Sequence, residues 1–207
     1  MSQKFNEKFD GKIFKVGTQI IENPLTKKSM ETTLIKSPHW VQCLAITKSL
    51  KVVLVRQFRF GINKLTLELP GGILDNCNFA ATGFAIRDNA LRELEEETGY
   101  VGTDSNVIYQ TSIHANPAFM NNSVYGVCVV DVDDQLVETK LDENEFCNTK
   151  LISLHELPLF IDFIDNPYSS LLIYRFMDFL KFNKKDPICK PLWKEIKRGN
   201  KELKSKP

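Results

Sequence analysis

The sequence predicts an α/β protein, with a β-sheet and two amphipathic helices preceded by a small β-subdomain. Residues 41–46, 51–59 and 123–130 are rich in β-branched and other apolar residues, as strands are. Apolar residues recur at helical spacing in two later segments, 86–94 and 172–180. These two patterns together predict the fold class.

Length and composition fit one sizeable core. The chain has 207 residues, of which 43% are hydrophobic and 26% are charged, and its net charge is +1. Such a balanced charge creates no global field that would recruit nucleic acid or an anionic membrane, so we expect neither as a partner. No apolar run approaches the length of a membrane span, and residues 1–7 lack the apolar core of a signal peptide.

The cysteine pattern favours a reducing compartment. The chain has five cysteines, an odd number, and none of them form a C-x-x-C motif. A disulfide framework or a zinc knuckle is therefore not expected, and free thiols are. We expect a cytoplasmic protein.

The N-terminal segment, residues 1–38, is expected to form the small β-subdomain. Residues 12–16, 18–22 and 31–35 have strand composition, and Asn23-Pro24 marks a turn before the third. A meander of this size has too little apolar surface to be stable alone. It should pack on the rest of the chain or on a second copy.

The main domain is expected to span residues 39–183. Residues 52–55 are continuously apolar, which predicts a strand buried on both sides. A short strand at 66–69 ends at the turn Pro70-Gly71-Gly72. The next helix should bury Ile86, Ala90, Leu91 and Leu94 and end at Gly99, a residue that adopts the left-handed cap conformation easily.

The second half of this domain continues with strands and a closing helix. Strands are expected at 106–110, 123–130 and 150–154, followed by an amphipathic helix at 169–182. From residue 184 onward the chain is basic and contains two prolines. We expect residues 184–207 to be a loosely held, solvated tail with at most a short helix near 193–197.

An acidic cluster is the main functional candidate. Glu93, Glu95, Glu96 and Glu97 occupy four of five consecutive positions in the first helix. Glu93 lies three and four residues before Glu96 and Glu97, and like charges at those spacings repel by roughly 0.2–0.5 kcal/mol per pair. A hard divalent cation would turn this repulsion into attraction. The alternative is a solvated acidic surface.

The segment from Arg92 to Tyr100 decides between these interpretations. Its pattern Arg-Glu-Leu-x-Glu-Glu-x-Gly-aromatic, after a strand and a Pro-Gly-Gly turn, resembles the second half of the Nudix hydrolase signature. The resemblance covers roughly residues 40–182. It implies an α/β/α sandwich around a mixed β-sheet.

The first half of the signature departs from the family pattern. Gly72 lies twenty residues before Arg92, about six more than the family spacing, which indicates an insertion within residues 74–84. The position eight residues before Arg92, a glutamate in the family, is Phe84. Asp75 and Asp88 are the only acidic residues in the segment between Gly72 and Arg92, and neither can be assigned the missing role.

The resemblance implies roles for the acidic cluster. Glu93, Glu96, Glu97 and the carbonyl of Gly71 would hold one to three Mg²⁺ ions, with Mn²⁺ as a possible substitute. Glu96 and Glu97 would thereby be catalytic. Arg92 would orient a carboxylate, although a surface ion pair is the alternative.

Other residues resemble the ADP-ribose pyrophosphatases within this family. The resemblance rests on residues 55–59, residues 68–72, a proline after the signature, an acidic loop at 142–145 and the segment 165–170. It implies substrate contacts by the following residues: Arg56, Arg59, Glu68, Pro117 and Phe119.

The acidic loop would supply the residue that positions the attacking water, either Glu143 or Glu145. Each of these assignments has a plain alternative. The arginines could be solvated charges, Phe119 could be a packing residue, and the acidic loop could be a flexible surface loop.

The expected function is Mg²⁺-dependent hydrolysis of a nucleoside diphosphate derivative, with ADP-ribose giving AMP and ribose 5-phosphate as the favoured reaction. The resemblance also implies a homodimer formed through the N-terminal subdomain. One alternative is a pyrophosphatase for other nucleotide sugars, dinucleotides or oxidised nucleotides. A second is a non-catalytic module that binds nucleotide or a protein partner.

Overall fold

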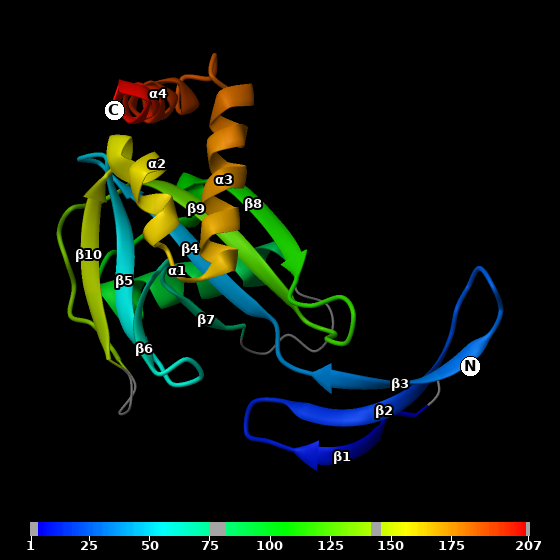
Figure 1. Cartoon of the computed structure of the whole chain (residues 1–207). Helices are drawn as coiled ribbons and strands as arrows, with labels where there is room; N and C mark the ends of the chain where they lie inside the picture. The colour runs from blue at the N-terminus through cyan, green and yellow to red at the C-terminus, as the bar shows by residue number, and fades with distance from the viewer. Residues whose placement is uncertain (1–3, 75–81, 142–145, 206–207) are drawn as a thin grey trace.

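The protein is built around a seven-stranded mixed β-sheet (Figure 1). The computed structural model describes residues 4–74, 82–141 and 146–205. The strands of this sheet are β4 Trp40–Thr47, β5 Lys51–Arg59, β6 Lys64–Glu68, β7 Gly71–Ile73, β8 Val107–His114, β9 Ser123–Val132 and β10 Cys147–Ser153. Five run in the order β10-β5-β4-β9-β8, while β6 pairs with β5 and β7 with β4.

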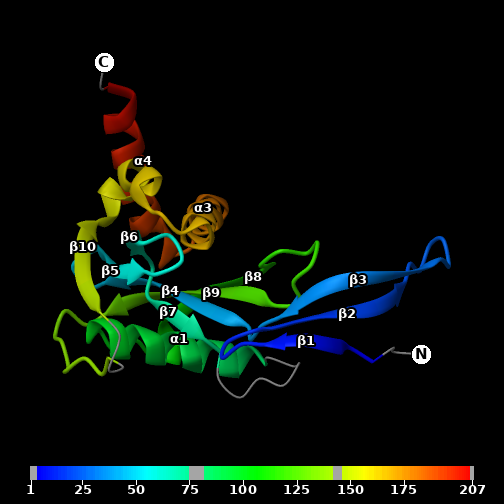
Figure 2. The same ribbon diagram turned by 60° about the horizontal axis from the view of Figure 1, so that its bottom comes forward.

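Helices cover both faces of this sheet, as the sequence predicts. β4 and β9 are parallel and the other pairs are antiparallel, so the sheet is mixed. Helix α1, Gly83–Thr98, lies on one face, and α3, Pro167–Phe182, lies on the other (Figure 2). The α/β/α sandwich is confirmed.

The residues of β4 show how one strand serves two cores. Val41, Cys43 and Ala45 pack in the cluster that contains Ile86, Ala90 and Leu94 of α1. Leu44 and Ile46 pack in the other cluster, with Leu172 and Phe176 of α3. Because successive side chains of a strand point to opposite faces, a continuously apolar strand is stable only between two covering layers.

Helix α1 ends where the sequence indicates, and a side chain caps its N-terminus. The hydroxyl of Thr82 accepts a hydrogen bond from the N–H of Ala85 and caps the N-terminus. Gly99 has φ of 75° and donates its N–H to the carbonyl of Glu95. A side chain on Gly99 would also meet the carbonyl oxygen of Val137, since its Cβ would lie 2.4 Å away. The left-handed glycine cap is confirmed.

The N-terminal strands form a separate three-stranded sheet. They are β1 Asn6–Asp10, β2 Lys15–Glu22 and β3 Ser29–Lys36, paired in the order β1-β2-β3. This sheet extends away from the main body (Figures 1 and 2). It is joined to the body by a hydrogen bond from the N–H of Ile35 to the carbonyl of Phe119, of 2.8 Å.

The strand boundaries of this small sheet differ from the expectation. The strands predicted at 12–16 and 18–22 are one strand, β2, and β1 lies where no strand was predicted. Gly17 lies within β2, where the paired strand β1 runs very close to it. A Cβ at Gly17 would lie 2.4 Å from the carbonyl oxygen of Asn6. The glycine permits this approach of two backbones.

The expectation of a loosely held C-terminal tail is wrong. Residues Cys189–Ser205 form a 17-residue helix, α4, and Cys189, Leu192 and Ile196 on one side of it are buried. These three recur at spacings of three and four residues, which is the helical pattern of a packed face. The remaining surface of the helix carries exposed basic residues: Lys190, Lys194, Lys197, Arg198 and Lys201.

The two prolines of this segment do not prevent the helix. Pro187 precedes α4, and Pro191 lies in its first turn, where the missing N–H has no partner within the helix in any case. The carboxylate of Asp186 accepts hydrogen bonds from the N–H groups of Ile188 and Cys189, at 2.9 and 3.1 Å. The helix therefore has an acidic residue at its start.

Helix α4 packs on the segment that follows β10. That segment consists of η2 Leu154–Glu156, α2 Leu157–Phe160 and η3 Ile161–Phe163, for which no elements were predicted. Gly199 of α4 is buried directly against His155, and a Cβ at Gly199 would lie 1.7 Å from the His155 carbonyl oxygen. Among the described residues, no helix is both long and apolar enough to span a membrane.

We predict that Gly199→Ala destabilises the protein. The added methyl group would collide with the backbone of His155 in η2, so α4 must move away from η2, at a cost of about 1–3 kcal/mol. Chemical unfolding monitored by circular dichroism measures the change. Lys197→Ala, at an exposed position of the same helix, is the control and should leave the free energy of unfolding unchanged within about 0.5 kcal/mol. Equal stability of Gly199→Ala and the wild type would contradict this packing.

Candidate active site

The acidic face of α1 contacts the glycine turn that follows β6. Glu97 is only 2% exposed, and its carboxylate accepts a hydrogen bond of 2.8 Å from the N–H of Gly71. The carboxylate of Glu93 lies against Gly72, because a Cβ on that glycine would be 2.7 Å from the carboxyl carbon and both oxygens. The structure thus brings together Gly71, Gly72, Glu93 and Glu97.

Arg92 binds two of the neighbouring carboxylates. Its guanidinium donates to Glu93 at 2.8 Å and also to Glu96, one turn further along the helix. A third bond, of 3.2 Å, goes to the side-chain oxygen of Asn89. Arg92 therefore forms ion pairs with both Glu93 and Glu96.

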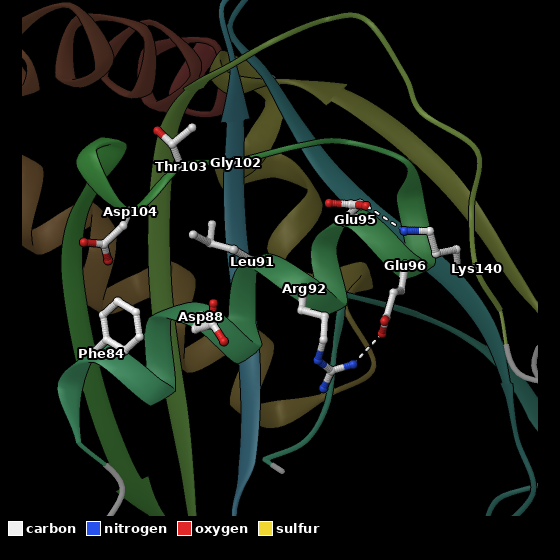
Figure 3. A pocket seen from close by; sticks show the side chains of 10 residues that line it. All are labelled: Phe84, Asp88, Leu91, Arg92, Glu95, Glu96, Gly102, Thr103, Asp104 and Lys140. Atoms are coloured by element: carbon white, nitrogen blue, oxygen red, sulfur yellow. Dashed lines mark hydrogen bonds and ion pairs between the residues drawn. The ribbon is translucent and has the colours of Figure 1, made fainter. Parts of the chain in front are cut away.

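Glu95 points to a different side of the helix. It forms an ion pair of 3.1 Å with Lys140, as Figure 3 shows. A cavity of about 410 Å³ lies along this side of α1, and Arg92, Glu95, Glu96 and Lys140 are among its lining residues (Figure 3). Asp88 lines the same cavity.

The acidic cluster has the donor chemistry of a site for a hard cation. Three carboxylates and a backbone carbonyl at Gly71 are the oxygen ligands that Mg²⁺ prefers. Within residues 4–74, 82–141 and 146–205, however, no three His, Cys, Asp or Glu side chains are already grouped so that they could hold a metal ion. The Arg92 guanidinium lies between Glu93 and Glu96 and donates to both.

A larger cavity, of about 560 Å³, opens on the other side of the glycine turn. Its lining contains both polar and apolar residues. The polar lining includes Gln42, Arg59, Thr66, Glu68 and Asn166, and the apolar lining includes Ile13, Trp40, Phe60, Ile62 and Ile73. Gly71 and Gly72 also line it, so the cavity and the acidic face of α1 meet at one turn. A pocket of this size and mixed lining is typical of a small-molecule site.

Arg59 and Glu68 form the main ion pair in this cavity. Two parallel hydrogen bonds, both of 2.8 Å, join the guanidinium to the carboxylate. Burial would raise the pKa of Glu68, but hydrogen bonds from Arg59, Thr66 and Asn166 outweigh it and hold the pKa below the usual value. The hydrogen bond to Glu68 raises the pKa of Arg59. Both groups therefore stay ionised at neutral pH.

Arg56 does not join Arg59. Residues of β5 alternate between the two faces of the sheet, and Arg56 falls on the face of Val52 and Leu54, which pack in the α3 cluster. Arg56 is exposed and is absent from the lining of the 560 Å³ cavity. Residues separated by an even number of positions lie on the same face of a strand, but Arg56 and Arg59 are three positions apart and lie on opposite faces.

The remaining predicted residues lie elsewhere. Pro117 and Phe119 are exposed in the connection between β8 and β9, and neither lines the 560 Å³ cavity. Glu143, Glu145 and Asp75 lie outside the described residues. The structure thus places Arg59 and Glu68, but neither Pro117 nor Phe119, at the cavity beside the glycine turn.

Several cavity residues were missed by the sequence analysis. Asn166 had a readable signal, because asparagine before proline at the start of an amphipathic segment is an N-cap signature. No sequence signal indicated a functional role for three other lining residues, Trp40, Gln42 and Tyr168. Each lies in a segment with the pattern of an ordinary strand or helix. Gln42 is 7% exposed and donates to the Ser169 hydroxyl at 3.0 Å. Only the approach of α3 to β4 brings these two residues together.

The chain is similar to proteins of known activity. It is 30% identical to an ADP-ribose pyrophosphatase of Bacillus subtilis over 148 residues, which cover 72% of this chain and 75% of that protein. It is 29% identical to a methanol dehydrogenase activator of Bacillus methanolicus over 163 residues, covering 75% of this chain and 83% of the relative.

The fold has a similar solved structure, and the sequence matches a family model. A crystal structure of an ADP compounds hydrolase superposes with a TM-score of 0.68 at 16% identity, covering 88% of this chain and 95% of that one. The NUDIX domain model matches residues 39–172, which include the glycine turn, α1 and the whole seven-stranded sheet. The chain therefore belongs to the Nudix family of hydrolases.

Proposed function

We propose that this enzyme hydrolyses the diphosphate bond of ADP-ribose, with Mg²⁺, to give AMP and ribose 5-phosphate. One observation carries the proposal: the Gly71–Gly72 turn joins the acidic face of α1 to a cavity that contains Arg59. The turn thus connects the carboxylates that would hold a metal with the cavity whose arginine would bind a phosphate. The similarity to the Bacillus subtilis ADP-ribose pyrophosphatase supports this substrate.

The chemistry of a diphosphate requires these two kinds of group. Nudix hydrolases act on nucleoside diphosphate derivatives and generally use divalent metal ions. Cleavage needs neutralisation of charge on the phosphate oxygens and a water aligned with the bond that breaks. Arg59 supplies positive charge to the cavity, and the apolar residues that also line it suit the rest of a nucleotide.

The metal would be held by the acidic face of α1. The proposed ligands are Glu93, Glu96, Glu97 and the Gly71 carbonyl, which form an all-oxygen set. When bound, Mg²⁺ would neutralise phosphate charge and lower the pKa of a coordinated water. Arg92 would keep Glu93 in place, since it already donates to that carboxylate. Glu143 and Glu145 remain the proposed residues for positioning the water.

We further propose that a second copy of the chain covers the N-terminal sheet, so that residues 1–38 dimerise and residues 39–183 carry the reaction. The sheet and its connections expose several large apolar side chains: Phe9, Ile13, Phe14, Ile20, Ile21, Leu25 and Met30. Exposed apolar surface of this extent indicates an interaction site. The connection between β1 and β2 supplies Ile13 to the 560 Å³ cavity, so a partner on this sheet would lie close to the substrate.

The proposed location is the cytoplasm. The four cysteines among the described residues form no disulfide with one another, and Cys43 and Cys128 are buried in the core. Burial raises the pKa of both thiols, so they stay protonated and unreactive at neutral pH. Free thiols of this kind fit a reducing compartment.

The first prediction tests the reaction. Wild-type enzyme with Mg²⁺ should release AMP from ADP-ribose, and EDTA should stop the release. Glu97→Gln should lower kcat by about 100-fold or more, because a metal-binding charge is lost while the amide oxygen still accepts from Gly71. Phosphate released from AMP by a coupled phosphatase measures the rate.

Glu95→Gln is the matched control, because it makes the same change on the side of α1 that faces Lys140. Its kcat should equal the wild-type value. A panel of nucleotide sugars, dinucleotides and oxidised nucleotides, ranked by kcat/KM, tests the substrate. A compound with a higher kcat/KM than ADP-ribose would replace ADP-ribose as the proposed substrate. If no diphosphate is cleaved, the proposed hydrolase activity is wrong.

The second prediction concerns the glycine turn. In Gly72→Ala the new Cβ meets only the flexible end of Glu93, so the protein should fold while the carboxylate is displaced and kcat falls by about tenfold or more. In Gly71→Ala the Cβ would lie 2.2 Å from the backbone oxygen of Val41, so stability should fall as well. Thermal melting and steady-state kinetics on both variants separate the two effects. Full activity of Gly72→Ala would disprove the role of Glu93.

The third prediction concerns assembly. Ile21 and Met30 are directly opposite on β2 and β3 and are 45% and 69% exposed. The full-length chain should sediment as a dimer, and the double variant Ile21→Glu, Met30→Glu should sediment as a monomer, since two buried carboxylates without partners oppose association. Sedimentation velocity gives both masses, and a monomeric wild type would remove the dimer from the proposal.

A further inference from the structure

Glu68 has no acceptor capacity left for a substrate. Its carboxylate receives hydrogen bonds from Arg59 Nε and Nη2, both at 2.8 Å, from the Thr66 hydroxyl at 2.6 Å and from Asn166 Nδ2 at 2.6 Å. A carboxylate has about four lone-pair sites, and here four donors occupy them. The residue is also 1% exposed, so a direct contact with a substrate hydroxyl is excluded in this arrangement.

Arg59 has the opposite property. A guanidinium carries five N–H donors, and the two bonds to Glu68 use two of them. Its side chain is 44% exposed and lines the same cavity as Gly71 and Gly72. The remaining N–H groups are therefore open to a ligand in that cavity. A guanidinium fixed on one edge and open on the other is suited to bind a phosphate oxygen.

Asn166 connects this pair to α3. Its side-chain oxygen caps the helix by accepting from the N–H groups of Tyr168 and Ser169, at 2.9 and 3.3 Å. Its side-chain nitrogen donates to Glu68. One amide group therefore both begins the helix and completes the set of donors around the carboxylate.

The neighbours of Asn166 align the whole first turn of α3 with β6. The carboxylate and N–H of Asp165 bond to the N–H and carbonyl of Leu67, at 2.9 and 3.1 Å. The Ser169 hydroxyl accepts from the N–H of Leu69 at 3.2 Å. Three consecutive residues of this strand region, with Glu68 in the middle, are thus bound to the start of α3.

We propose that Glu68 and Asn166 are positioning residues, which hold the Arg59 guanidinium so that its open edge binds a phosphate of the substrate. The inference rests on the proposed function and changes the part that the sequence suggested for Glu68, from substrate contact to support. A free arginine side chain samples many rotamers, and holding it in one reduces the entropy lost on binding. Glu68 therefore contributes to affinity through Arg59 alone.

A double-mutant cycle tests this directly. The variants are Glu68→Gln, Arg59→Ala and the two together, and titration calorimetry in EDTA measures the Kd of ADP-ribose without turnover. Each single variant should weaken binding by roughly 10-fold or more, the value of a charge-assisted hydrogen bond. The double variant should bind no more weakly than Arg59→Ala. Two effects that multiply, or a Glu68→Gln with unchanged Kd, would overturn the inference.

A second variant approaches the same contact from α3. Asn166→Asp keeps the oxygen that caps the helix but places a carboxylate beside Glu68, where the amide nitrogen now donates. It should weaken ADP-ribose binding in the wild-type background and have no effect in the Arg59→Ala background. If Glu68→Gln does not fold, Asn166→Asp takes its place in the double-mutant cycle with Arg59→Ala. An equal loss of affinity in the wild-type and Arg59→Ala backgrounds would contradict the proposal.

The matched control is Asp104→Asn. Asp104 is the carboxylate partner of Arg87 on the outer side of α1, so the substitution makes the same chemical change to an arginine pair outside the 560 Å³ cavity. Its Kd should equal the wild-type value. A wild type that binds ADP-ribose in EDTA but cleaves nothing with Mg²⁺ contradicts the proposed function. Multiplying effects in the cycle contradict only the positioning role.

Discussion

The hydrogen bond from the Gly71 N–H to the Glu97 carboxylate is the interaction on which the site depends. A buried carboxylate is costly unless donors compensate it, and Gly71 provides one from the backbone. Gly71 also pairs with Gln42 of β4, at a distance that no side chain on it would permit. Sheet, turn and helix are therefore aligned at one residue.

The first turn of α3 is the counterpart of this contact on the other side of the cavity. It binds β6 through backbone and side-chain groups on either side of Glu68. Glu68 in turn holds Arg59, whose charge also acts on Glu97. The glycine turn, which contacts the acidic face of α1, and the N-terminus of α3 thus line one cavity, although the two helices lie on opposite faces of the sheet.

The contrast between α1 and α4 shows when the spacing of apolar residues predicts a helix and when it does not. Both helices have buried residues at spacings of three and four. In α4 this apolar stripe is short and lysines surround it, and one proline precedes the helix while another lies in its first turn. Composition therefore suggested a tail. The helix is stable because Leu192 and Ile196 pack on α2 and α3. This burial outweighs the polar composition, and it cannot be predicted from the residues of the helix alone.

The sequence by itself determined the fold class, helix α1 with its glycine cap, and the acidic face that carries the Nudix signature. These depend on local periodicity and on short motifs, which are written in consecutive residues. The tertiary structure decided the surroundings of that face. Arg59 was separated from Arg56 by strand alternation, and Glu68 was joined to Asn166, 98 residues away. Contacts of such long range depend on how α3 packs against the sheet, so local pattern cannot reveal them.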